Sequence, residues 1–204
     1  MIFNHAFRCA ALIALSLFFL SACSLVPHQS TPQVDIAEHT QVSLPTPASL
    51  GYQLSASQLI TASWAIDGKT TSEQLPVQLQ VTDNEVVLAG FSSWGTRVLS
   101  LSYDGEQIQT EVLNGLQGSL PQPEQVLFNL MITLWPSSAW EGSLNEVRWR
   151  IIDKNNSRAI FDSDGEKIIE IQYSSSNKLE GKIDFHHLKH QFSISIQTLQ
   201  HQIN

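Results

Sequence analysis

The chain has 204 residues, with 11 basic and 19 acidic side chains and a formal net charge of −8 at pH 7. An acidic protein gains nothing from anionic lipid headgroups and is repelled by nucleic acid, so we expect neither to attract it through charge. The length suits a single domain with a sizeable core.

The first residues have the layout of a bacterial lipoprotein signal peptide. Arg8 precedes an apolar run over residues 9–20, which is too short to span a bilayer comfortably. Small residues then lead to Cys23 in the sequence Leu20-Ser21-Ala22-Cys23. This sequence resembles the lipobox, in which the thiol receives a diacylglycerol, the peptide is cut before the cysteine and the new amine is acylated. We therefore predict a signal peptide over residues 1–22 and lipidation, including a palmitate-like acyl chain, at Cys23.

The acyl chains predict where the mature protein resides. Each buried CH2 of a lipid anchor contributes about 0.8 kcal/mol, and two or more chains make attachment stable. Ser24 follows the cysteine, and the absence of Asp there favours the outer membrane over the inner membrane. We expect the outer-membrane bilayer to be a partner through acylated Cys23, with the protein facing the periplasm. Cys9 leaves with the signal peptide, so we expect no disulfide and no cysteine metal site.

Residues 23–50 read as the lipidated cysteine followed by a flexible, Pro-rich tether. Pro27, Pro32, Pro45 and Pro47 are mixed with Ser, Thr and Gln. At about 3.1 Å per residue, an extended chain of this kind reaches several nanometres, and its later part can also pack on the domain. The folded domain is then expected over residues 51–204.

Alternation of apolar and polar residues predicts β-strands from Gly51 onward. One face of the first strand is apolar with one polar exception, Gln58; the face consists of Leu54, Ala56, Gln58, Ile60, Ala62, Trp64 and Ile66. Turn sequences such as Asp104-Gly105 and Asp164-Gly165 separate similar segments. Together these segments predict about ten antiparallel strands with one buried and one wet face.

A helix interrupts the strands in the middle of the chain. Pro123 suits a first helical turn, and apolar residues then recur at helical spacing until Pro136: Val126, Leu127, Leu130, Met131 and Leu134. A second helical piece is expected near residues 140–144. Because ten strands in one sheet tend to curl, we predict a mainly β fold, a single curved antiparallel sheet that forms an incomplete barrel around the central apolar helix.

Two segments of the chain resemble the DUF3261 family: residues 95–105, Gly-Thr-Arg-Val-Leu-Ser-Leu-Ser-Tyr-Asp-Gly, and residues 127–136, Leu-Phe-Asn-Leu-Met-Ile-Thr-Leu-Trp-Pro. The order of elements agrees over roughly residues 50–200. The family is similar in architecture to LolA/LolB-like proteins, which carry lipoproteins or other lipids across the periplasm in an open half-barrel, and it is often encoded beside aryl-polyene genes. The resemblance implies a LolA/LolB-like half-barrel over residues 51–204.

Large apolar side chains are candidates for ligand contact, although most of them must belong to a core. The ligand-cavity candidates are Phe128, Met131, Leu134, Trp135 and Trp149. The exposed-loop candidates, which would suit contact with a lipid surface or a carried ligand, are Phe91, Trp94 and Trp140.

Three arginines are candidates for the polar rim of a cavity. Arg97, Arg148 and Arg150 could pair with a ligand carboxylate or phosphate, with Arg148 and Arg150 on one face of a strand. The alternative, which we favour, is that all three are solvated. Arg97 has the stronger case of the three because it lies in a family-like segment.

The titratable clusters have two interpretations each. His186 or His187 with His190 could bind a metal, and residues 162–166 alternate oxygen ligands as a calcium loop does. We favour turns between strands for both, and expect no metal and no cofactor. The chain has no G-x-S-x-G, H-E-x-x-H or P-loop sequence, so no catalytic residue is predicted.

The leading hypothesis is an outer-membrane lipoprotein that binds a lipid-like or acylated ligand in an apolar half-barrel cavity and assists its transfer, with an aryl-polyene lipid as the cargo that the resemblance implies. Periplasmic or transport-machinery proteins are further candidate partners. The alternative is a non-catalytic assembly factor with a filled core that acts through its surface. A weaker third hypothesis is a hydrolase or transferase whose site is assembled from distant residues.

Replacing Cys23 with Ala tests the anchor. We expect the C23A protein to leave the membrane fraction, because the thiol that receives the diacylglycerol is gone. Cell fractionation followed by immunoblotting measures this, with Cys9→Ala as the control that keeps its membrane association. A C23A protein that still sediments with membranes would contradict the lipobox prediction.

Overall fold

The computed structural model describes residues 31–66, 68–116 and 122–204. The predicted signal peptide, Cys23, Ser24 and the first part of the predicted tether lie outside these residues. Thr31–Asn204 forms one compact unit with its own hydrophobic core. None of the helices in the described part of the chain has both the length and the hydropathy needed to cross a bilayer.

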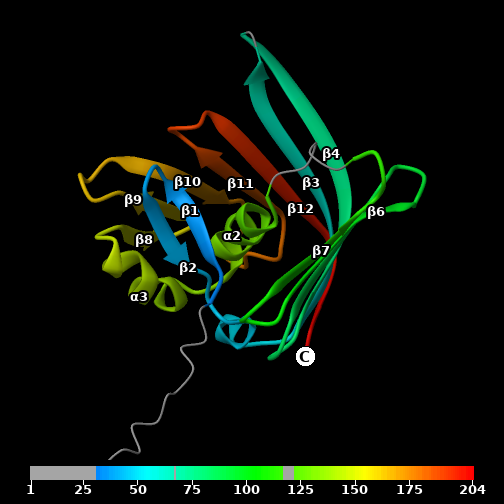
Figure 1. Ribbon diagram of the computed structural model, residues 1–204, viewed down its shortest axis with the longest axis horizontal. Helices are drawn as coiled ribbons and strands as arrows, with labels where there is room; N and C mark the ends of the chain where they lie inside the picture. The colour runs from blue at the N-terminus through cyan, green and yellow to red at the C-terminus, as the bar shows by residue number, and fades with distance from the viewer. Residues whose placement is uncertain (1–30, 67, 117–121) are drawn as a thin grey trace, which may run out of the picture. The chain divides into compact units, whose positions relative to one another are not determined.

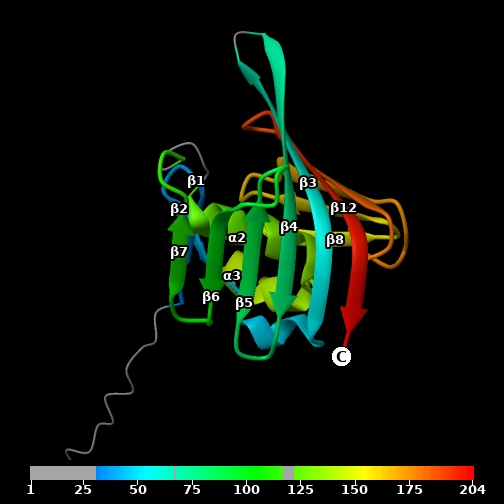
Figure 2. The same cartoon turned by 90° about the vertical axis from the view of Figure 1, so that its right-hand side faces the viewer.

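Ten strands form one antiparallel sheet (Figures 1 and 2). In chain order they are β3 (Leu54–Ile66), β4 (Lys69–Val81), β5 (Val86–Phe91), β6 (Arg97–Tyr103), β7 (Ile108–Val112), β8 (Arg150–Lys154), β9 (Ser157–Phe161), β10 (Lys167–Tyr173), β11 (Lys182–His187) and β12 (Phe192–Ile203). Their order in space is β7-β6-β5-β4-β3-β12-β11-β10-β9-β8, so the edges β7 and β8 do not pair and the barrel stays open. The predicted mainly β class and the open, curved sheet are confirmed.

The pattern of alternation decides which face of each strand is buried. Along β6, Leu99, Leu101 and Tyr103 are buried, whereas the residues between them are only half-buried. Successive side chains of a strand point to opposite faces, so one apolar set turns toward the core. The same rule places Gln58 of β3 on the buried face, where it is the polar exception.

β3 and β4 are longer than their neighbours and project beyond them as a hairpin, which Figure 2 shows. β5 pairs with β4 only over Val77–Val81, whereas β3 pairs with β4 from Lys69 to Val81. The segment Lys69–Pro76 is therefore paired on one side only.

Two helices follow β7. α2 (Pro123–Leu134) lies on the concave side of the sheet, and α3 (Ser138–Glu146) follows it closely in sequence (Figure 1). Pro123 occupies the first turn of α2, as predicted, and Glu124 places a negative charge at the positive end of the helix dipole. Seven of the twelve residues of α2 are buried, which confirms that this helix must be covered by protein.

The N-terminal part of the described chain differs from the predicted tether. β1 (Gln33–Ala37) and β2 (Thr40–Ser43) form a separate hairpin, followed by a short 3-10 helix, η2 (Pro47–Leu50). This segment contributes five core residues that are 1–5% exposed: Val34, Ile36, Val42, Leu44 and Leu50. The boundary predicted at residue 51 was wrong, because short alternating apolar pairs in this segment supply enough buried surface to order it.

Hydrogen bonds tie this segment to the core. The Trp135 indole Nε1 donates to the carbonyl of Thr46 at 3.1 Å, and the Tyr103 hydroxyl donates to the carbonyl of Pro45 at 3.1 Å. Two of the prolines that suggested a flexible tether, Pro45 and Pro47, therefore lie where buried side chains bind backbone carbonyls.

The C-terminal turn of α2 is held by a buried arginine from β9. Arg158 is 0% exposed, and its Nη1 donates to the carbonyls of Ile132 at 2.6 Å and Trp135 at 2.8 Å. Its Nε and Nη2 donate to the carboxylate of Asp153 at 2.6 and 2.8 Å. The last carbonyls of a helix lack partners within the helix and carry partial negative charge, so a guanidinium is a suitable donor for them.

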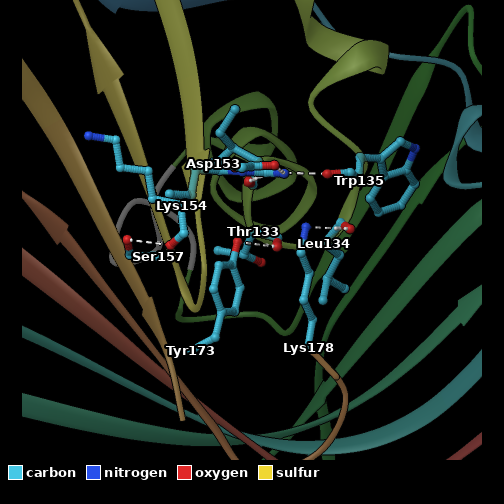
Figure 3. Close-up of polar contacts among 10 residues, drawn as sticks. Thr133, Leu134, Trp135, Asp153, Lys154, Ser157, Tyr173 and Lys178 are labelled. Atoms are coloured by element: carbon cyan, nitrogen blue, oxygen red, sulfur yellow. Dashed lines mark hydrogen bonds and ion pairs between the residues drawn. The ribbon is translucent and has the colours of Figure 1, made fainter. Parts of the chain in front are cut away.

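Two further side chains bind the same turn. The Tyr173 hydroxyl donates to the carbonyl of Thr133 at 2.8 Å, and Lys178 Nζ lies 3.5 Å from the carbonyl of Leu134 (Figure 3). Burial raises the pKa of Tyr173 to about 12, and burial together with the nearby Arg158 lowers the pKa of Lys178 to about 8. The hydrogen bond from Arg158 lowers the pKa of Asp153, which keeps the carboxylate ionised as its counter-charge. Four consecutive carbonyls, Ile132 to Trp135, are thus contacted by side chains of β9, β10 and the β10–β11 connection.

Replacing Arg158 with Met tests this anchor. We expect R158M to lower the free energy of unfolding by about 3 kcal/mol or more, because it leaves two helix carbonyls without their donor and Asp153 without its partner. Urea denaturation followed by circular dichroism measures the change. Arg150→Met, at an exposed arginine of the adjacent strand, is expected to stay within about 0.5 kcal/mol of wild type. Equal stabilities for the two variants would show that the buried guanidinium is not the anchor.

Candidate ligand-binding face

The inner faces of β3 and β12, together with Leu75 of β4, carry a row of apolar side chains that is only partly covered. Beyond Leu75 the inner face of β4 is polar, with Glu73 and Thr71 paired to Ala62 and Trp64. Ile60, Ala62 and Trp64 of β3 pair directly with Ile196, Ile194 and Phe192 of β12. Six residues in this region are half-buried, and we call them the apolar strip: Ile60, Ala62, Trp64, Leu75, Phe192 and Ile194. Four of them pack against the main hydrophobic core, namely Ile60, Leu75, Phe192 and Ile194.

Toward the other end of the same strands the cover is complete. Leu54 and Ala56 of β3 and Val77 and Leu79 of β4 are 1–2% exposed. The inner face therefore changes along β3 from closed core to apolar surface that water reaches. Figure 1 shows α2 beside the lower part of this sheet and the β3–β4 hairpin rising past it.

Gly90 of β5 makes room for one member of the apolar strip. A Cβ placed on Gly90 would lie 2.7 Å from Cδ2 of Leu75, which is too close for two carbon atoms. The Leu75 side chain therefore lies over the bare backbone of β5. A larger residue at position 90 would have to displace Leu75 and change the floor of the strip.

A shallow pocket of about 370 Å³ lies near Trp64 and Phe192, at the end of the sheet where β11 connects to β12. Its volume falls within the range of small-molecule sites. The strip contributes Trp64 and Phe192 to its lining, and the end of β11 with its connection to β12 contributes His187, Leu188 and Gln191. The other five lining residues belong to the opposite face of the sheet, so the pocket is not confined to the strip: Ser63, Ala65, Thr70, His186 and Ser193.

His187 forms one wall of this pocket. It is 5% exposed, and its ring stacks on Phe192 with the centroids 5.1 Å apart and the planes at 28°. Its Nδ1 accepts a hydrogen bond from the backbone N–H of His190 at 3.2 Å. Burial, with His190 and Lys189 nearby, lowers the pKa of His187 to about 4, so the imidazole is neutral at neutral pH.

The histidine cluster lies at a connection between strands, as the favoured interpretation has it, although β11 extends to His187 rather than ending at Phe185. Within residues 31–204, apart from the undescribed positions, no three His, Cys, Asp or Glu residues are grouped so that they could share a metal ion. At the other candidate metal site, Asp162 Oδ1 accepts the N–H groups of Asp164 and Glu166 at 3.0 and 2.9 Å, which is the geometry of a tight turn.

Gln58 lies on the inner face and was noted in the sequence as a polar exception, but it was not predicted to be a site residue. It is 1% exposed, and its Nε2 donates to Oγ1 of Thr198 at 3.2 Å. Its Oε1 is buried and has no hydrogen-bond partner among the described residues. The signal that could have identified it is the single polar residue in the apolar alternation of β3.

The five ligand-cavity candidates are packed in the core. Phe128, Met131, Leu134, Trp135 and Trp149 are 0–3% exposed. Four of them lie on α2 or at its C-terminal end, where Arg158 and Tyr173 bind the helix. These residues can line an open cavity only if α2 moves, and this role stays a prediction.

The three exposed-loop candidates differ in their exposure to solvent. Trp94 is 92% exposed in the β5–β6 turn, and Phe91 at the end of β5 is half-buried. The expectation for Trp140 was wrong: it is 0% exposed and packs edge-on against Phe128, with the centroids 5.4 Å apart. Trp140 lies on α3 rather than in a loop, and α3 turns its apolar residues Trp140 and Leu144 inward.

Trp94 and the pocket lie at the same end of the sheet. Antiparallel pairing makes β3, β5 and β11 run in one direction, so the turns that follow them share one edge of the barrel. This end carries two further exposed apolar side chains, Leu113 at 46% and Leu188 at 45%. We call it the open end.

The three arginines predicted for the cavity rim do not form a common site in the structure. Arg97 of β6 pairs with Glu111 of β7 at 3.2 Å, and both side chains are exposed. Arg150 lies on β8, at the other end of the strand order, with its guanidinium 5.9 Å from the centre of the Phe161 ring. Arg148 was wrongly placed on a strand: β8 starts at Arg150, and Arg148 has a left-handed φ of 61° in the turn after α3.

The low pKa of His187 predicts how stability changes with pH. The unfolded chain takes up a proton near its ordinary pKa of 6.5, whereas the folded chain does so only near 4. Protonation therefore favours unfolding, and stability falls as the pH drops through this window. We expect His187→Phe to reduce the loss in denaturation experiments between pH 7 and pH 4. His186→Gln, at an exposed neighbour, serves as the control, and parallel curves for wild type and H187F would contradict this assignment.

Comparisons with known proteins give remote structural likenesses. A protein domain from Vibrio parahaemolyticus, assigned to outer membrane lipoprotein sorting, has 6% identity and a TM-score of 0.41, and the match covers 74% of this chain and 85% of that domain. A LolA superfamily protein from Nitrosomonas europaea has 6% identity and a TM-score of 0.39, covering 79% and 94%. A DUF1329 family protein from Desulfovibrio piger has 7% identity and a TM-score of 0.36, covering 78% and 93%. At these values the likenesses identify no ligand.

No curated protein matches the chain significantly. The family model described as protein of unknown function DUF3261 matches residues 55–200, which include both helices, eight strands of the main sheet completely and most of β3 and β12. The match begins one residue into β3 and ends within β12, the strand that pairs with it. The chain therefore belongs to the DUF3261 family.

Proposed function

We propose that this protein is an outer-membrane lipoprotein that binds a lipid-like or acylated molecule along the apolar strip and assists its transfer at that membrane. The observation that carries the proposal is the strip itself, an apolar inner face that continues from the core past the region where cover is complete. Binding an acyl chain there would remove apolar surface from water, at about 25 cal/mol per Å². Transfer of this kind needs weak, reversible binding and no catalytic group.

The open end supports access from a membrane or from a partner. Leu188 exposes a large apolar side chain at the pocket, Trp94 exposes another at the same end of the sheet, and tryptophan is favoured at membrane interfaces. A lipid reaching the strip from this end would pass Trp64 and Phe192 first. The membrane anchor at Cys23 belongs to the same proposal, as does an aryl-polyene lipid as cargo, which rests on the family resemblance.

The closed packing around α2 favours a second function. Phe128, Met131 and Trp135 fill the centre of the barrel at 0–1% exposed, as an assembly factor with a filled core would have them. Such a protein would act through its surface on partner proteins. The two functions differ in one respect that can be measured, which is whether the folded protein takes up an apolar ligand.

Native mass spectrometry with lipid extraction distinguishes them. Soluble protein comprising residues 24–204, which contain the compact unit, would be purified from the periplasm of its own host. A co-purifying lipid or polyene supports the carrier and identifies its cargo. A ligand-free mass, with no uptake of added lipids, would favour the assembly factor.

Two neighbouring substitutions on β3 test the location of the site. We expect Ala62→Glu to reduce lipid uptake at least tenfold, because it places a charge on the apolar strip, whereas Thr61→Glu places the same charge on the opposite face. Both residues are half-buried, so the pair is matched for exposure. Uptake is measured by fluorescence of a hydrophobic dye and by native mass spectrometry, with circular dichroism to confirm folding. Equal uptake by the two variants would exclude the strip as the binding surface.

A further inference from the structure

A buried amide lies at the inner limit of the apolar strip. Gln58 precedes Ile60 on the same face of β3, and its Oε1 has no partner among the described residues although the side chain is 1% exposed. We propose that Gln58, with Thr198, is a polar subsite that binds the hydroxyl of a neutral amphiphile whose hydrocarbon chain lies on the apolar strip. This inference rests on the proposed function and specifies its ligand class.

The surroundings of Gln58 make its unpaired oxygen unusual. On the sheet its cross-strand neighbours are Thr198 of β12 and Val77 of β4, and its neighbours along the inner face of β3 are Ala56 and Ile60. Thr198 is the one polar side chain among these four. Burying a polar atom without a hydrogen bond destabilises the folded state, so a leucine or methionine would be the stabilising choice at this position if nothing bound there.

The chemistry of the pair indicates a hydroxyl. A threonine hydroxyl both donates and accepts, so it can satisfy either end of the Gln58 amide and leave the other end free. A ligand hydroxyl also donates and accepts, and therefore satisfies the free end in both orientations of the amide. A carboxylate would bring a charge into apolar surroundings, and none of the four sheet neighbours of Gln58 is a cation to balance it.

The distances suit an amphiphile bound with its head group inward. Six residues separate Gln58 from Trp64 along β3, which at about 3.3 Å per residue is about 20 Å. This is the length of a long extended hydrocarbon chain. Ile60, Ala62 and Trp64 lie along that path on the inner face, and all three are half-buried.

Two probes of equal chain length test the subsite, 1-dodecanol and 1-chlorododecane, which lacks the hydroxyl. We expect the wild-type protein, residues 24–204, to bind the alcohol about tenfold more tightly, the effect of one net hydrogen bond in a buried site. In Gln58→Met the preference should disappear while the affinity for 1-chlorododecane remains. Gln78→Met, the same change at an exposed glutamine of β4, is the control and should keep the preference. Displacement of a bound fluorescent dye gives both affinities.

The other outcomes separate the inference from the function on which it rests. Equal affinities of wild type for the two probes, as expected if a buried water satisfies Gln58, would overturn the subsite and leave the carrier intact. A preference that persists in Q58M would also overturn it. Failure of wild type to bind either probe would overturn the proposed function itself. Thermal melting of ligand-free Q58M and of a second variant, Gln58→Leu, guards against misfolding, and both are expected to melt at or above the wild-type temperature.

Discussion

The position of α2 depends on one buried guanidinium. A helix inside a curved sheet ends with carbonyls that no residue of the helix can satisfy, and water does not reach this helix end. Arg158 supplies two of the missing donors and carries its own counter-charge, Asp153, on the neighbouring strand. Because Arg158, Tyr173 and Asp153 all come from β8–β10, the helix is fixed to one half of the sheet.

This fixation divides the inner face into two regions. Next to α2 the side chains pack as an ordinary core, with Met131 and Ile132 fully buried. On the other half of the sheet, β3 and β12 continue past that core and keep apolar side chains on the same face, whereas β4 adds Leu75 and then the polar residues Glu73 and Thr71. The core packing and the proposed ligand contact thus fall mainly on different segments of the same strands.

Much of this arrangement could be predicted from the sequence, because strand alternation and helix spacing are local signals. The turns at Asp104-Gly105 and Asp164-Gly165, the helix between Pro123 and Pro136, and the curvature of a ten-stranded sheet all follow from such signals. Arg158 could not be identified this way. In the sequence it is one polar residue in an alternating strand, and its burial depends on a helix end 23 residues earlier in the chain.

The same limit explains the errors at Trp140 and in residues 33–50. Whether an aromatic residue near a helix end is buried depends on what the helix packs against, and for Trp140 this is Phe128. Proline-rich composition suggested a tether, but composition does not reveal that Tyr103 and Trp135 bind carbonyls within that segment. Gln58 is the opposite case, since its exceptional position was visible in the alternation while its unpaired oxygen was not.

The projecting β3–β4 hairpin has a consequence for how the protein associates with itself. A strand paired on one side only offers a template to which a second chain can add, and such edges promote aggregation. Over Lys69–Pro76 this edge carries a cation at Lys69, an anion at Glu73 and, at Pro76, a residue without a backbone N–H. Charges and proline oppose the addition of a strand. The hairpin can therefore extend beyond the barrel without recruiting a second copy of the chain.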